Sequence, residues 1–241
     1  MSTTDLSGDA EIPEGLVEAV VHLVDTGPVP LGAYTLAEID AVSGVVHFLE
    51  RDPEPELVAE AVRSLAARNL ITTKPGSDHV EVRGDLGIAL AFQQRGRRVL
   101  DARVTGTEPD TPWRFVLMPQ PEGVTLEILI DALGIHFFSL RKTTEALDRL
   151  WKRLPAGHRG PKGADADSLL DSSPRTALVS VSSWQDDGTR ETSDVVLAQE
   201  GDICHVFMRD PGDPSSLVAH GLDNDEWRKV VRRLAGAGKA G

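Results

Sequence analysis

The spacing of apolar residues changes once along this chain, near Arg97, and that change constrains the fold more than any other feature. Before it, apolar residues recur every three or four positions, as they do along one face of an amphipathic helix. After it, they alternate with polar residues, which is typical of half-buried strands. The pattern therefore predicts an α+β protein with a helical first part and a strand-rich remainder.

The strand-rich part contains the same order of elements twice. Its first half, residues 98–154, has strand-like runs at 99–104, 113–118, 124–130 and 135–140, then a helix capped by Thr143 or Thr144. Its second half, residues 176–236, has runs at 176–184, 194–199, 203–208 and 217–221, then a helix capped by Asn224. The two halves superimpose at an offset of roughly 80 residues, so each is predicted to be a ββββα unit.

A four-stranded antiparallel unit with one helix covers only one face of its sheet. Two such units are predicted to form one pseudo-symmetric antiparallel sheet in a single compact domain. Their helices would lie on one side, and the N-terminal helices would pack on an edge or face. Residues 155–175 are rich in Gly, Pro, Ser and Asp and are predicted to be a flexible linker.

Residues 1–97 are predicted to be a helical segment with one short hairpin. Thr35 and Glu38 form a capping box, so a helix should begin at Leu36. The expected elements are helices at 13–26, 36–49 and 52–68, the last capped by Asp52, a hairpin of 70–73 and 79–82, and a helix at 85–95 with Gly96 as C-cap.

The formal net charge is −13 at pH 7. A field of this sign repels phosphate backbones and anionic lipid, so nucleic acid is an unlikely partner and membrane insertion is not expected. The longest apolar runs are far shorter than the ~20 residues of a spanning helix, and Met1–Asp5 lacks the basic start of a signal peptide. Together with the single cysteine, Cys204, these features predict a cytoplasmic protein.

The sequence carries none of the common motifs of catalysis. The chain contains no phosphate-binding loop, nucleophile elbow or zinc-protease motif. Cys204 and His205 adjoin on one expected strand and so point to opposite faces, while Asp223 and Asp225 suit a helix N-terminus. We therefore expect no catalytic residue, no metal site and no cofactor, and interpret His136 and His205 as ordinary sheet residues.

Aromatic residues are few, which gives their positions more weight. Phe137 and Phe138 are neighbours on an expected strand, so one ring should lie on each face. Trp113 and Trp184 lie near strand ends. Because exposed aromatic clusters anchor partner proteins, Trp113, Phe137, Phe138 and Trp184 are candidate partner-binding residues; the alternative is that each completes the core.

Three stretches carry a resemblance to a known family. Val62–Ile71, Val82–Leu90 and Arg97–Val104 resemble segments of the type VII secretion-specific chaperones (EspG-like proteins) of actinobacteria. In that family a helical start precedes two pseudo-symmetric halves. The resemblance implies a cytosolic chaperone that shields an aggregation-prone helical tip of a secretion substrate.

These observations favour a non-catalytic scaffold that binds another protein in a groove on the sheet or beside the C-terminal helices. Two alternatives remain open. The first is a winged-helix DNA-binding regulator built from residues 35–98. Its phosphate contacts would come from Arg63, Arg68, Lys74, Arg83, Arg95, Arg97 and Arg98. The second is a small-molecule-binding protein or enzyme whose site residues are dispersed in the sequence.

Overall fold

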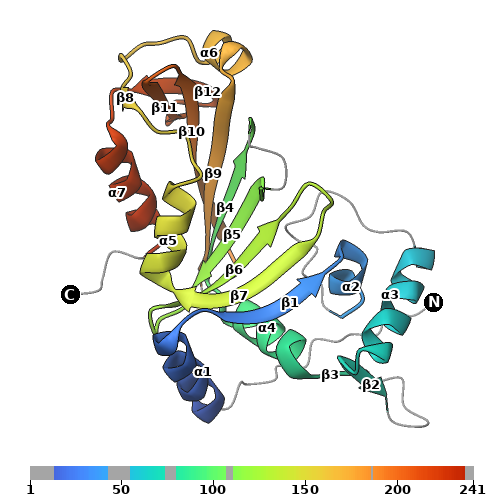
Figure 1. Cartoon of the computed structure of the whole chain (residues 1–241). Helices are drawn as coiled ribbons and strands as arrows, with labels where there is room; N and C mark the ends of the chain where they lie inside the picture. The colour runs from blue at the N-terminus through green and yellow to red at the C-terminus, as the bar shows by residue number, and fades with distance from the viewer. Residues whose placement is uncertain (1–13, 43–54, 74–79, 107–110, 186, 237–241) are drawn as a thin grey trace.

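The fold is organised around one long, mostly antiparallel sheet. The computed structural model describes residues 14–42, 55–73, 80–106, 111–185 and 187–236. The strands lie in the order β1-β7-β6-β5-β4-β9-β10-β11-β12, and β8 pairs in parallel with β11 (Figure 1). Their bounds are β1 Val29–Tyr34, β4 Arg98–Val104, β5 Arg114–Pro119, β6 Val124–Ile130, β7 His136–Lys142, β8 His158–Arg159, β9 Arg175–Trp184, β10 Arg190–Glu200, β11 Ile203–Asp210 and β12 Asp213–His220.

Two similar halves meet at the centre of this sheet. Strands β4 and β9 are antiparallel neighbours, with Leu100 opposite Val181. From them, one meander runs through β5, β6 and β7 to α5 (Thr143–Trp151), and the other runs through β10, β11 and β12 to α7 (Asn224–Leu234). The arrangement places a pseudo-two-fold axis between β4 and β9 and confirms the predicted fold class.

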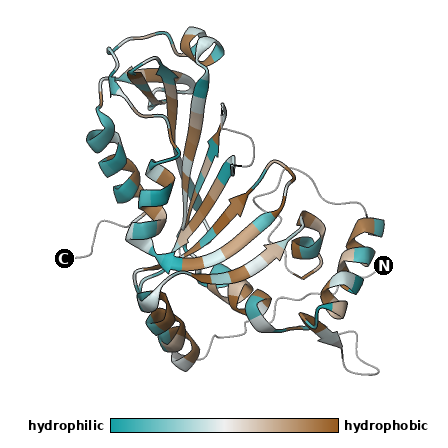
Figure 2. Cartoon of the chain, in the orientation of Figure 1, coloured by the Kyte–Doolittle hydropathy of each residue, from teal (hydrophilic) through white to brown (hydrophobic). Residues whose placement is uncertain are grey.

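The two faces of the sheet are covered by different helices. Leu100 and Val179 face α5 and α7, which cover one side and contribute Leu147, Trp151 and Trp227 to a shared core. On the opposite face, α1 (Glu14–Thr26) and α4 (Gly84–Arg95) pack against the first half. Figure 2 shows the matching hydropathy, with apolar strands in the first half and a hydrophilic outer side on α7.

The N-terminal segment follows its sequence signals closely where it is described. Helix α2 (Leu36–Asp40) begins with the expected capping box: the Glu38 amide donates to Thr35 Oγ1 at 3.2 Å, and the Thr35 amide donates to Glu38 Oε2 at 3.0 Å. The helix ends at Asp40, before the predicted end at residue 49. Positions 43–54, including the Asp52 cap, lie outside the described residues.

The remaining N-terminal elements were also expected. Helix α3 spans Pro55–Ala67, and a hairpin joins β2 (Ile71–Thr73) to β3 (Val80–Val82). Gly96 follows α4 as predicted, but its φ of −66° is not the left-handed conformation of a typical glycine C-cap.

Strand β1 was not predicted. It pairs with β7 at the edge of the sheet, and its register shifts between Pro30 and Gly32. Both residues are depleted in strands, and proline is tolerated only at an edge or bulge. The local sequence therefore does not predict a strand here, and β1 forms because it pairs with β7.

Residues 155–175 contain regular structure, which corrects the prediction of a flexible linker. Helix α6 (Ala166–Ser172) begins where the Asp165 side chain accepts from the Asp167 amide. A Cβ at Gly157 would lie 2.4 Å from the Asp202 carbonyl oxygen. The segment is thus glycine-rich partly because its backbone lies against β11.

Two predicted helix caps are each displaced. The cap of α7 is Asp223 instead of Asn224, and it forms a capping box with Glu226. The cap position of α5 is Lys142, which makes no side-chain capping bond, while Thr143 already lies in the helix.

Candidate functional site

The seam between the two halves carries the most distinctive surface of the protein. Helices α5 and α7 are amphipathic, so each buries an apolar stripe on the sheet and the two lie side by side (Figure 1). Their tryptophans meet there: the rings of Trp151 and Trp227 are 5.5 Å apart at 83°, an edge-to-face contact. The seam is therefore held by one aromatic ring from each half.

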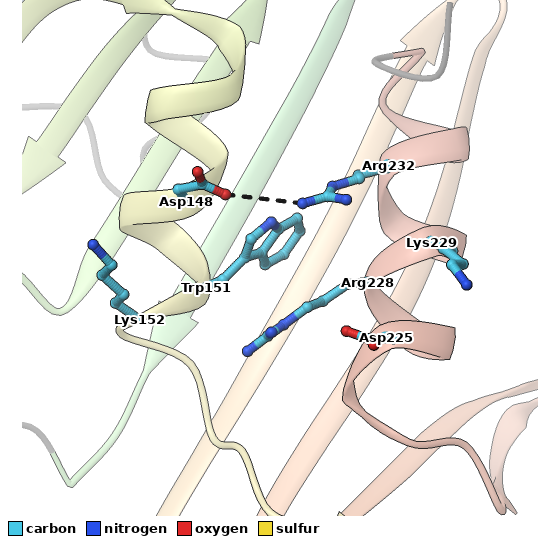
Figure 3. Close-up of a pocket in the computed structure, with 7 residues that line it drawn as sticks. All are labelled: Asp148, Trp151, Lys152, Asp225, Arg228, Lys229 and Arg232. Atoms are coloured by element: carbon cyan, nitrogen blue, oxygen red, sulfur yellow. Dashed lines mark ion pairs between the residues drawn. The ribbon is translucent and has the colours of Figure 1, made fainter.

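A groove of about 500 Å³ lies between these two helices, and we call it the α5–α7 groove. In Figure 3 the Trp151 ring projects from α5 into the space between the helices, flanked by Arg228 and Arg232 of α7. The lining residues are Asp148, Trp151, Lys152, Asp225, Arg228, Lys229 and Arg232.

The α5–α7 groove is basic, although the whole chain carries a net charge of −13. Four of its lining residues are basic and two are acidic. The one ion pair seen within it, Arg232 to Asp148, is long at 3.9 Å. Among the described residues, Lys152, Arg228 and Lys229 form no ion pair. The groove thus offers cationic groups whose charge is not locally balanced.

Two hydrogen-bond donors at this groove are buried without acceptors. Trp151 Nε1 and Arg228 Nε are shielded from water, and neither has a partner within the described part of the chain. The Arg228 guanidinium lies 5.5 Å from the Trp227 ring centroid, and that of Arg232 lies 5.8 Å from Trp151. Aromatic faces thus hold both arginines at the groove.

A larger hollow of about 890 Å³ continues from this groove at the end of the sheet. Asp148 and Arg232 line both spaces, so the two are contiguous. The hollow, which we call the sheet-end hollow, adds four basic residues and two acidic ones. These are Arg95, Arg97, Arg98, Lys142, Asp25 and Glu122.

The four aromatic residues predicted for partner binding do not form one patch. Phe138 is buried, 2 % exposed, and the centroid of its ring lies 5.6 Å from that of the Tyr34 ring. Trp113 and Trp184 are half-buried against the same core, but at opposite ends of β4: Val104 donates to the Trp113 carbonyl, and Trp184 donates to the Arg97 carbonyl. Only Phe137 is well exposed, at 43 %.

The sequence did contain a weak signal for the groove. Arg228, Lys229 and Arg232 stand among the apolar residues of α7, but such charges usually mark a solvated helix face. What distinguishes them is the neighbouring helix α5, which the sequence does not place beside them.

Four of the seven basic residues of the alternative DNA-binding segment are paired, while Arg97 and Arg98 are in no ion pair among the described residues and Lys74 lies outside them. Arg63 pairs with Glu60, Arg68 with Glu38, Arg83 with Glu81 and Arg95 with Glu122. These carboxylates reduce the positive charge that the segment presents to phosphate.

The single cysteine does not have the environment of a nucleophile. The Cys204 thiol is 2 % exposed, and burial raises its pKa to about 11, which disfavours the nucleophilic thiolate. Within the described ranges, no three His, Cys, Asp or Glu side chains are grouped so that they could hold a metal ion. The helices described there are also too short or too polar to cross a membrane.

Comparison with known proteins adds no further assignment. No protein-family model matches the chain, and no curated protein matches it significantly.

Proposed function

We propose that this protein is a non-catalytic, cytosolic protein-binding scaffold that acts as a chaperone for a helical region of a secreted partner. The observation that carries the proposal is the α5–α7 groove, a hollow between two helices that come from different halves of the fold. Grooves between helices are a common docking place for a third amphipathic helix.

The composition of the groove supports binding of a protein. Interface centres are enriched in tryptophan and arginine, and both line this hollow. The Trp151 ring packs edge-to-face on the fully buried Trp227 and is itself only 5 % exposed, so the floor of the groove is fixed before a partner arrives. The resemblance to EspG-like chaperones points to the same class of function.

The test is affinity capture of tagged protein from its native cytosol, with co-purifying chains identified by mass spectrometry. A double variant, Arg228→Glu with Lys229→Glu, reverses the charge of two residues that line the groove. Arg63→Glu on α3 is the control because Arg63 is exposed and does not line the groove. We expect one protein at near-equal amounts with the native chain and the control, and its loss with the double variant.

Two results would contradict the proposal. One is recovery of nucleic acid in place of protein, which would favour the winged-helix alternative. The other is recovery of the same protein by the native chain and the groove variant, which would place the binding surface elsewhere.

A further inference from the structure

The buried donors of the α5–α7 groove indicate what its occupant must supply. An N–H group that is buried without an acceptor destabilises the protein relative to one that is paired. Trp151 Nε1 and Arg228 Nε are two such groups on facing helices. An occupant that brings acceptors between the helices, with a shift of the side chains that cover these two atoms, would relieve them.

The surrounding charge specifies the kind of acceptor. Lys152, Lys229 and Arg232 line the same groove as Arg228. A carboxylate can accept from an indole N–H or from an arginine, and hydrogen bonds between charged groups are roughly twice as strong as neutral ones. A backbone carbonyl would satisfy the donors but would leave the excess positive charge unbalanced.

The extent of the basic surface indicates the size of the occupant. The α5–α7 groove opens into the sheet-end hollow through Asp148 and Arg232, and the hollow adds Arg97 and Arg98, for which no ion pair is seen in the described residues. A single small anion would occupy only part of this surface. A helix with several acidic side chains would occupy its whole length.

Resting on the protein-binding function proposed above, we infer that the occupant is an acidic amphipathic helix of the partner protein. Its carboxylates supply acceptors to Trp151 Nε1 and to Arg228, whose partly buried side chain turns toward them. Further acidic residues lie along the sheet-end hollow toward Arg97 and Arg98.

The test measures the affinity of the full chain for a panel of labelled helical peptides of about 18 residues, long enough to span about 27 Å. Each peptide carries a leucine stripe and flanking glutamates, and each has a twin in which glutamine replaces every glutamate. We expect the acidic peptides to bind about tenfold or more tightly than their twins, with affinity falling as salt increases.

Two variants separate the proposed contacts from general charge. Trp151→Phe keeps an aromatic ring but removes the N–H donor together with part of the indole, and Arg228→Gln removes the cation. Each should weaken acidic peptides several-fold more than their neutral twins, which report any loss of ring contact. Arg63→Gln is the control, and thermal melting checks that the variants fold.

Equal affinity for acidic and neutral twins would overturn the acidic occupant while leaving the protein-binding function intact. Failure of every peptide, together with failure of the capture experiment, would overturn both. Sedimentation showing a dimer that dissociates with the Arg228→Glu and Lys229→Glu double variant would assign the groove to a second copy of the chain and overturn the inference.

Discussion

The first half of the sheet is enclosed on both faces, whereas the second half is enclosed on one. In the first half, Leu126 and Ile128 of β6 lie under the N-terminal helices, and α5 covers part of the other face. In the second half, the face opposite α7 presents Ser180 and Asp194, and α6 covers only a small cluster around Phe207. The two halves share one topology but differ in the side chains on this face, which are apolar where helices cover the sheet and more polar where they do not.

The α5–α7 groove is the site to which both halves contribute. The N-terminal helices belong to one half only, but the α5–α7 groove takes its walls from both. The pseudo-symmetry thus creates the groove at the one position where the terminal helices of the two halves meet. Equivalent core variants in the two halves should therefore lower the free energy of unfolding by different amounts. Variants in the α5–α7 groove should instead weaken binding of the partner.

The largest expected difference between the halves is in core packing. Leu126→Ala removes a side chain with 0 % exposure in the enclosed first half, and we expect a loss of about 3–4 kcal/mol in the free energy of unfolding. Leu178→Ala, on the same face in β9 but half-buried, should cost only about 1 kcal/mol. Denaturant unfolding measures both, and equal losses would contradict the difference in cover.

On the face of the sheet opposite α5 and α7, loss of an ion pair should likewise destabilise the protein more in the first half than in the second. Asp101 accepts from Arg114 Nε and Nη2 at 2.9 and 2.8 Å, and the Arg114 side chain is only 4 % exposed. Asp101→Ala leaves that guanidinium buried and should cost about 3 kcal/mol. The second-half pair, Asp194 with Arg209, involves an arginine that is 53 % exposed, so Arg209→Ala should cost about 1 kcal/mol or less.

Alkaline pH should weaken the second half through Cys204. Because burial raises the pKa of its thiol to about 11, the folded state favours the neutral form. Its contribution is fully present below the ordinary thiol pKa and is lost as pH rises through the folded pKa of about 11, by about 3 kcal/mol in all. Comparing native protein with Cys204→Ala between pH 8 and 11 isolates this loss; parallel pH profiles would argue against it.

The smallest effect concerns the helix caps. Asp223 accepts from the amides of Asp225 and Glu226, whereas Lys142 makes no capping bond. Asp223→Ala should lower the Tm by about 2–4 °C, and Lys142→Ala by less. The Glu226 amide lowers the pKa of Asp223, so the cap stabilises α7 above the ordinary carboxyl pKa, and its effect should fade as pH falls below 4.

Much of the fold could be predicted because it follows local rules. The alternation around Leu126 and the capping box at Thr35 are each visible within a few residues. Strand β1 was missed because Pro30 and Gly32 contradict it locally and only β7 stabilises it. The ordered structure of residues 155–175 was missed because a glycine-rich sequence is typical of flexible linkers. Here the glycines instead permit close contact of the backbone with β11.

The candidate site was harder to predict than the fold. Phe138 was chosen for its aromatic ring, yet it points into the core, while its neighbour Phe137 is exposed. The groove depends on Trp151 and Arg228, which are distant in sequence and adjacent only because β4 pairs with β9. A contact that arises from the packing of two halves leaves no local sequence signal.

Site-specific photo-crosslinking can show which surface of the protein contacts the partner. A photoreactive amino acid is placed at Lys229 in the α5–α7 groove and, in a separate protein, at the exposed Phe137 on the sheet. If the α5–α7 groove holds the partner, position 229 crosslinks to one partner protein and position 137 to none. Crosslinks from position 137 without any from position 229 would contradict this placement of the partner.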